Sequence, residues 1–138
     1  MTLVVPTAGA VHAFLLRRRV FAPPPMQPAM AAALTARQRR EEARAIAARD
    51  AALARELRIG RPDLTRQFDD GGLVDVNHVP VRVLVDRLAL SPAQAAQVVE
   101  ARERLGGFAG PEELIAFTDL SPEAVDDLRA HLVFLAVD

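Results

Sequence analysis

One pattern occurs twice in the C-terminal half of the sequence. The stretch "ALSPAQAAQV" at residues 89–98 is followed thirty residues later by "DLSPEAVDDL" at residues 119–128. In each copy, hydrophobic residues at helical spacing stand both before and after the Leu-Ser-Pro. A short unit repeated in this way buries its apolar faces by packing against its neighbour. The repeat therefore predicts two stacked helix–turn–helix units and an all-α fold.

Each Leu-Ser-Pro has the composition of a helix start. Ser91 and Ser121 are predicted N-caps, whose hydroxyl groups accept hydrogen bonds from first-turn amides. The proline after each serine takes the first helical position, where no amide hydrogen is needed. Leu90 and Leu120, just before the caps, are predicted to fill the inside of each turn. These features have a complete structural explanation and do not by themselves indicate a function.

A long basic helix is predicted over residues 30–59, which contain neither Gly nor Pro and are rich in Ala and Arg. Gly60 and Pro62 should end it. Residues 60–73 are then a turn-rich linker, with a tight reversal at residues 69–72. The helix also carries an apolar stripe that needs a partner surface: Ala43, Ile46, Ala47, Leu53, Ala54 and Leu57.

Residues 1–29 combine an apolar N-terminal segment with a proline-rich spacer. The apolar run Leu3–Leu16 is followed at once by Arg17–Arg19. A helix of that run would span about 21 Å, less than the roughly 30 Å of a bilayer core. Membrane contact through residues 3–19 therefore stays open beside a loosely packed terminus. Because arginines are retained on the cytoplasmic side, we expect the chain in the cytoplasm or at the cytoplasmic face of the membrane.

The C-terminal half also contains short motifs outside the repeat. They are "VDVN" at 74–77, "VVEARE" at 98–103, "GGF" at 106–108 and "EEL" at 112–114. With these motifs, residues 73–135 resemble the tandem helix-hairpin-helix module of the ComEA-type competence DNA receptors. The resemblance implies a four-helix domain over residues 74–138 that follows the long helix. It also implies binding to the backbone of double-stranded DNA without sequence preference, through hairpin amides.

The resemblance places the candidate nucleic-acid contacts in the two hairpins. They are Ala89, Leu90 and Ser91 with Arg87 in hairpin 1, and Asp119, Leu120 and Ser121 in hairpin 2. The family's Gly-hydrophobic-Gly pattern is lost at all four glycine positions. A side chain in left-handed geometry costs about 1 kcal/mol or more, and Asp119 puts a carboxylate where a phosphate would lie. We therefore expect DNA binding to be weakened, and hairpin 1 to be the better candidate.

Charge leaves a second function open. Residues 1–73 carry a net charge of +5, whereas residues 74–138 carry a net charge of −6. An acidic module repels DNA but suits a basic protein partner, so the alternative is a protein-interaction or scaffold module. The arginines of the long helix are further phosphate candidates, although the acidic residues among them favour a solvated face. These candidates are Arg37, Arg39, Arg40 and Arg44.

Catalysis and metal chemistry have little support in the sequence. It contains no Cys and no Lys, which excludes thiolate chemistry and a lysine Schiff base. His12, His78 and His131 are scattered, without metal-ligand or triad spacing. We expect no cofactor, no metal site and no enzymatic activity.

Overall fold

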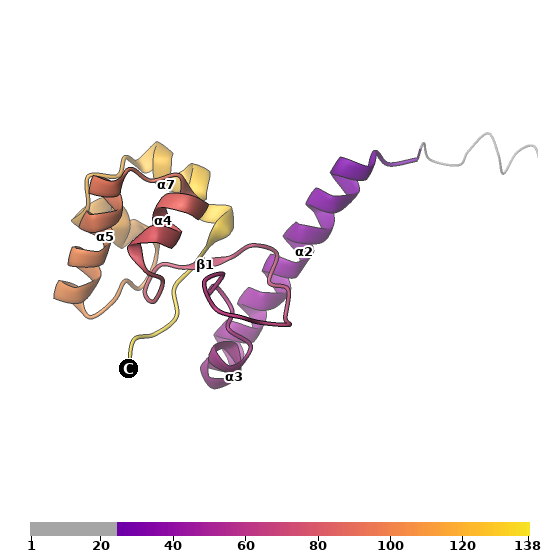
Figure 1. Cartoon of the computed structure of the whole chain (residues 1–138), viewed down its shortest axis with the longest axis horizontal. Helices are drawn as coiled ribbons and strands as arrows, with labels where there is room; N and C mark the ends of the chain where they lie inside the picture. The colour runs from indigo at the N-terminus through magenta and orange to yellow at the C-terminus, as the bar shows by residue number, and fades with distance from the viewer. Residues whose placement is uncertain (1–24) are drawn as a thin grey trace, which may run out of the picture. The chain divides into compact units, whose positions relative to one another are not determined.

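The computed structural model describes residues 25–138 and is mostly helical there (Figure 1). The apolar run and the arginines for which membrane contact stays open, residues 3–19, lie outside the described residues. Residues Ala32–Asp138 form one compact unit. Its elements are α2 (Pro28–Arg49, which begins just before the unit), α3 (Ala51–Glu56), β1 (Val74–Asp75), α4 (Val81–Leu88), α5 (Pro92–Leu105), α6 (Pro111–Phe117), α7 (Pro122–Leu128), the 3-10 turn η1 (Arg129–His131) and β2 (Leu132–Val133).

The two predicted helix–turn–helix units are confirmed as α4–α5 and α6–α7. Ser91 and Ser121 are the N-caps of α5 and α7, and each hydroxyl accepts a hydrogen bond from the amide three residues later. Leu90 and Leu120 are buried inside the turns. The all-α fold class and the local signals that predicted it therefore hold.

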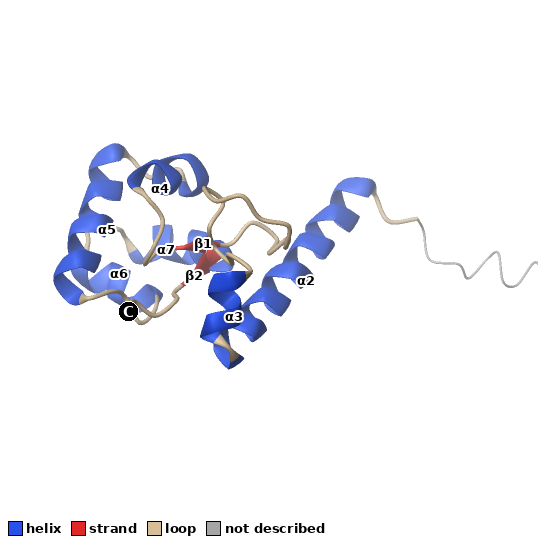
Figure 2. Cartoon of the chain, turned by 60° about the horizontal axis from the view of Figure 1, so that its bottom comes forward, coloured by secondary structure: helices blue, strands red, loops and turns tan. Residues whose placement is uncertain are grey.

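The helix predicted over residues 30–59 is interrupted, contrary to expectation. α2 ends at Arg49, and Asp50 has an extended backbone with φ −147°. The Asp50 carboxylate accepts a hydrogen bond of 2.9 Å from the amide of Leu53 and so starts α3. Aspartate favours such caps over helix interiors because its side chain competes for backbone amides. The break lets α3 pack beside the end of α2 (Figure 2).

A small parallel sheet that the sequence did not reveal joins the two ends of the C-terminal module. β1 pairs with β2 in the register Val74 with Leu132 and Asp75 with Val133 (Figure 2). Successive side chains of a strand point to opposite faces. Leu132 accordingly packs into the module core, whereas Val133 packs into a second cluster beneath α2 and α3.

The module core and the second cluster are both apolar and buried. The module core consists of Val74, Val76, Val79, Val83, Leu84, Leu88, Leu90, Ala95, Val98, Ala101, Phe108, Leu114, Leu120, Val125 and Leu132. The second cluster consists of Ala43, Ala54, Ile59, Leu73, Val133 and Leu135. It supplies the partner surface that the apolar stripe of the long helix required, although Leu53 of that stripe stays exposed.

The "VDVN" and "GGF" motifs meet in the structure through one buried side chain. The amide group of Asn77 donates to the carbonyl oxygens of Phe108 and Leu135, each at 2.9 Å. Its oxygen accepts from the Phe108 amide at 2.7 Å. Gly107 lies against Asn77 with φ 102°, and a Cβ there would come within 2.8 Å of Val137. Asn77 therefore fixes the exit of α5 and the C-terminal tail to the start of the module.

Residues 60–73, expected to be a linker, pack tightly around a buried aspartate. Asp70 accepts hydrogen bonds from the amides of Gly60 at 2.7 Å and Gly72 at 3.0 Å, and it also pairs with Arg66. The predicted reversal at residues 69–72 is confirmed, with positive φ at Gly71 and Gly72. This loop holds α3 against the module.

Candidate nucleic-acid interface

Hairpin 1 keeps the backbone shape of a glycine turn without the glycine. Ala89 follows α4 in the left-handed conformation, with φ 53° and ψ 30°. Leu90 is buried, while Ala89 and Ser91 are exposed. The strain expected from the loss of glycine is therefore present at Ala89.

The amides of hairpin 1 are bound within the protein. The Ala89 and Leu90 amides both point to the carbonyl oxygen of Leu84, the latter at 3.4 Å. The Ser91 amide donates to Gln94 Oε1 at 3.0 Å, and the Gln94 amide donates to Ser91 Oγ at 3.1 Å. This reciprocal capping box uses the donors that a helix N-terminus would offer to a phosphate.

Hairpin 2 has a different backbone, which corrects the expectation of strain at every lost glycine. Thr118 is extended, with φ −133°, and Ser121 has φ −70°. Among the described residues, only Arg58 and Ala89 are non-glycine residues with positive φ. The replacement of glycine by Asp119, Ser91 or Ser121 therefore carries no left-handed strain. Only Ala89 does.

Hairpin 2 is closed by a side chain from α5. Gln97 Nε2 donates to Asp119 Oδ2 at 2.6 Å, and the Asp119 amide donates to Gln97 Oε1 at 3.1 Å. The Leu120 amide is bound by the Thr118 hydroxyl at 3.2 Å, and the Ala124 amide by Ser121 Oγ at 3.1 Å. A carboxylate and three internally bound amides leave hairpin 2 poorly suited to a phosphate.

The arginines near hairpin 1 fall into two groups. Arg82 and Arg87 are exposed on α4 and, within the described part of the chain, make no side-chain hydrogen bond or ion pair. Arg102 instead donates to the carbonyl oxygens of Val76 at 3.0 Å and Val79 at 2.6 Å. Burial lowers the pKa of Arg102. Arg82 and Arg87 are therefore available to a phosphate, whereas Arg102 holds α5 to the entry of the module.

The four candidate arginines of α2 are engaged elsewhere. Arg37 pairs with Glu41 one turn along the helix at 3.0 Å, Arg39 pairs with Asp69, and Arg40 donates to the Gly71 carbonyl oxygen at 3.0 Å. The structure thus brings none of them to the hairpins. Glu41 is only one helical turn from Arg37. The partners of Arg39 and Arg40 lie about thirty residues away in the sequence, so sequence reasoning could not find them.

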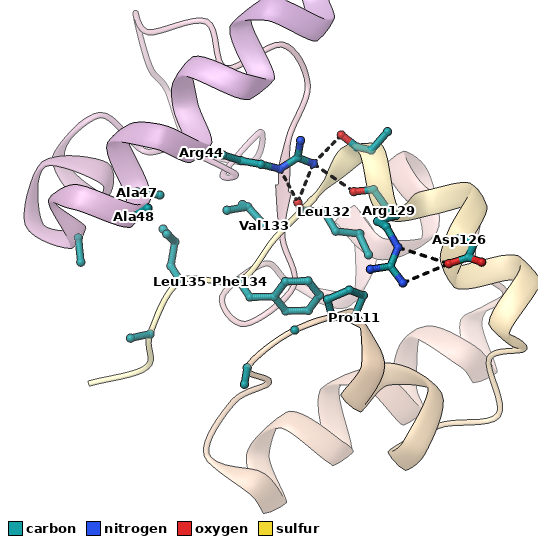
Figure 3. Close-up of a pocket in the computed structure, with 15 residues that line it drawn as sticks. Arg44, Ala47, Ala48, Pro111, Asp126, Arg129, Leu132, Val133, Phe134 and Leu135 are labelled. Atoms are coloured by element: carbon teal, nitrogen blue, oxygen red, sulfur yellow. Dashed lines mark hydrogen bonds and ion pairs between the residues drawn. The ribbon is translucent and has the colours of Figure 1, made fainter.

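Arg44 makes the most extensive of these contacts. Its guanidinium group donates to the carbonyl oxygens of Arg129, Ala130 and Leu132 at 2.7 to 3.3 Å (Figure 3). These carbonyls end the last helical turn, so Arg44 caps η1 from α2. Burial, followed by the charge of Arg40, lowers the pKa of Arg44. The residue ties α2 to the module.

The described residues contain neither a metal-binding cluster nor a membrane-spanning helix. Within residues 25–138 no three His, Asp or Glu side chains are grouped to hold a metal ion. No helix in that range is long and apolar enough to cross a membrane.

Comparison with known protein families adds one match. Residues 69–133 match the family model of the helix-hairpin-helix motif. The match begins at the loop before β1 and ends in β2, so it covers both helix pairs and the sheet that closes them. It concerns the motif and does not single out the ComEA-type receptors. No curated protein and no solved structure matches the chain.

Proposed function

We propose that the protein is a non-catalytic helix-hairpin-helix module that binds the backbone of double-stranded DNA weakly, without sequence preference, and through hairpin 1. The motif is generally nucleic-acid-binding. The single observation that carries the proposal is a pair of exposed arginines on α4, Arg82 in its first turn and Arg87 next to hairpin 1, whose guanidinium groups make no hydrogen bond or ion pair within the described residues. Such groups form charge-assisted hydrogen bonds to phosphate.

Weak binding follows from the hairpin's own hydrogen bonds. A phosphate would have to displace the Ser91–Gln94 capping box to reach the amides of α5. It would also approach a module whose net charge is −6, and this negative charge repels DNA at long range. The affinity should therefore come mainly from arginine contacts and fall steeply with salt.

A second candidate is a protein-interaction module, which the internal capping of both hairpins favours. Gln97 and Asp119 bind each other across hairpin 2 in two hydrogen bonds, as a stable protein surface would. On α7, Glu123 and Asp127 are exposed and make no ion pair within the described range, so a basic partner would find free carboxylates there.

The test is binding of the full chain to short duplex DNA at about 50 and about 200 mM salt. We expect measurable binding at the lower salt and its loss at the higher. The double variant Arg82→Ala/Arg87→Ala should abolish the low-salt binding.

The matched control is Arg37→Ala, which removes an exposed arginine from α2 and should leave binding unchanged. Binding that survives loss of Arg82 and Arg87 would contradict the assignment to hairpin 1. If the unmodified chain does not bind duplex DNA at either salt concentration, the interaction-module candidate takes its place.

A further inference from the structure

Three arginines away from the hairpins line one small pocket. Arg55 lies on α3, and Arg58 and Arg61 lie in the turns that follow it, with His78 from the module on the same wall. The pocket has a volume of about 240 Å³. Sites for drug-sized molecules usually measure about 300–1,000 Å³, so this pocket suits a small group. The lining also includes Asp75 and Asp138, so what the pocket can bind depends on which of its charges are already paired.

Arg58 occupies a position where glycine would be less strained. It follows the C-cap Leu57 with φ 56°, and the Ile59 amide reaches back to the Ala54 carbonyl oxygen at 3.0 Å. This is the helix-ending geometry in which a left-handed residue, usually glycine, is required. Strained residues concentrate at functional sites. The backbone conformation favours glycine over arginine at this position. The presence of an arginine is therefore explained by what its side chain does.

The arginines keep hydrogen-bond donors for a ligand. A guanidinium group has five N–H donors. Arg58 uses only Nη1, to the carbonyl oxygen of Thr65. Arg55 uses only Nη2, which donates to the Ala136 carbonyl oxygen at 3.1 Å and to Asp138 Oδ1 at 2.8 Å. The pocket thus already holds one carboxylate of its own chain, on an exposed side chain that a ligand can displace.

Two other carboxylates near the arginines are already occupied. Asp75 is buried in the pocket wall, and its Oδ1 accepts the amides of Asn77 and Leu135 while its Oδ2 contacts His78 Nδ1 at 2.5 Å. Asp63 binds Arg61 through both oxygens, at 3.0 and 2.8 Å. Arg55 pairs with the exposed Asp138, so within the described chain Arg58 is the arginine of this pocket that has no carboxylate partner.

We propose that this pocket binds a phosphate group, supplied either by a free phosphate compound or by a nucleic-acid backbone. Phosphate is the small anion whose several oxygens match converging guanidinium groups best. The proposal does not depend on DNA binding by hairpin 1, since none of Arg55, Arg58 and Arg61 lies in the hairpins.

The test is a titration of the full chain with inorganic phosphate at constant ionic strength, followed by the amide NMR signals of Gly60 and His78. We expect saturable shifts at these residues and none when chloride replaces phosphate. Arg58→Gly should weaken phosphate binding about tenfold, the loss of one charged hydrogen bond. The same variant removes the left-handed strain and also the hydrogen bond to Thr65, so its unfolding temperature should stay close to that of the unmodified chain. Loss of binding would then not reflect loss of folding.

Two further variants sharpen the result. Asp138→Asn removes the competing carboxylate from Arg55 and should strengthen phosphate binding, whereas Arg37→Ala on α2 should not change it. Absence of saturable shifts, or equal affinity in Arg58→Gly, would overturn the proposal. A parallel titration with short duplex DNA identifies the source. Shifts of the same signals point to the nucleic-acid backbone, and shifts with inorganic phosphate alone point to a free phosphate compound.

Discussion

Single residues decide how the two hairpins differ. At Ala89 the chain adopts a left-handed turn that glycine would adopt without strain, whereas Asp119 sits in a turn that needs no positive φ. The loss of glycine therefore has a different effect in each hairpin. It costs stability in hairpin 1, and it adds a side-chain contact to Gln97 in hairpin 2.

Ala89→Gly should stabilise the protein by up to about 1 kcal/mol, because glycine removes the left-handed strain. Chemical denaturation of the full chain measures the effect. Ala96→Gly, at an exposed position within α5, is the control and should destabilise by about 1 kcal/mol. Equal losses in both variants would show that Ala89 carries no strain.

Ser91→Ala should destabilise the protein by about 1 kcal/mol, since the Gln94 amide loses its cap. The free energy of unfolding of Ser91→Gly serves as the comparison, because glycine at an N-cap costs only a few tenths of a kcal/mol. If Ser91→Ala is as stable as the unmodified chain, the hydroxyl does not act as the cap.

At the scale of elements, α5 connects the two hairpins. Its first turn caps hairpin 1 through Gln94, and Gln97 one turn later closes hairpin 2. Opening hairpin 2 therefore requires the loss of a contact with the other helix pair.

Asp119→Gly should raise the affinity for duplex DNA at low salt, because it removes a carboxylate and the side-chain contact that holds Gln97 over the hairpin. Asp127→Ala removes the same charge from exposed α7 without touching the hairpin and should have a smaller effect. A salt-dependent binding titration separates them. An equal gain in both variants would mean that charge alone limits binding.

The helical elements could be predicted from the sequence because their signals are local. Ser-Pro starts and the paired glycines after α5 each act within one helix. Asp50 was missed because a cap inside an Ala-rich run resembles a solvated helical residue. The two-residue strands were missed because no alternation can show in a strand of two residues. The partners of Arg44 and Asn77 lie 31 to 88 residues away in the sequence, so no local pattern could predict these contacts.

At the scale of the whole molecule, α2 belongs to the folded unit and is more than a basic extension of it. Arg44 caps η1, and the second cluster buries Val133 and Leu135 of the module beneath α2 and α3. Arg55 of the basic half also pairs with Asp138 of the acidic half, so one ion pair joins the two oppositely charged halves of the sequence.

Arg44→Ala should lower the free energy of unfolding by about 2 kcal/mol, because charged hydrogen bonds to three carbonyl oxygens are lost. Arg37→Ala, whose ion pair is exposed, should change it by less than about 0.5 kcal/mol. Both are measured by chemical denaturation of the full chain. Similar values for both variants would show that α2 contributes little to the unit.

The parallel pairing of β1 with β2 also determines when, during synthesis, the sheet and the second cluster can form. Residue 74 leaves the ribosome long before its partner at residue 132, and Val133 and Leu135 complete the second cluster later still. Until then the apolar faces of α2, α3 and β1 have no cover from β2. These faces therefore stay without that cover until residues 132–135 have been synthesised.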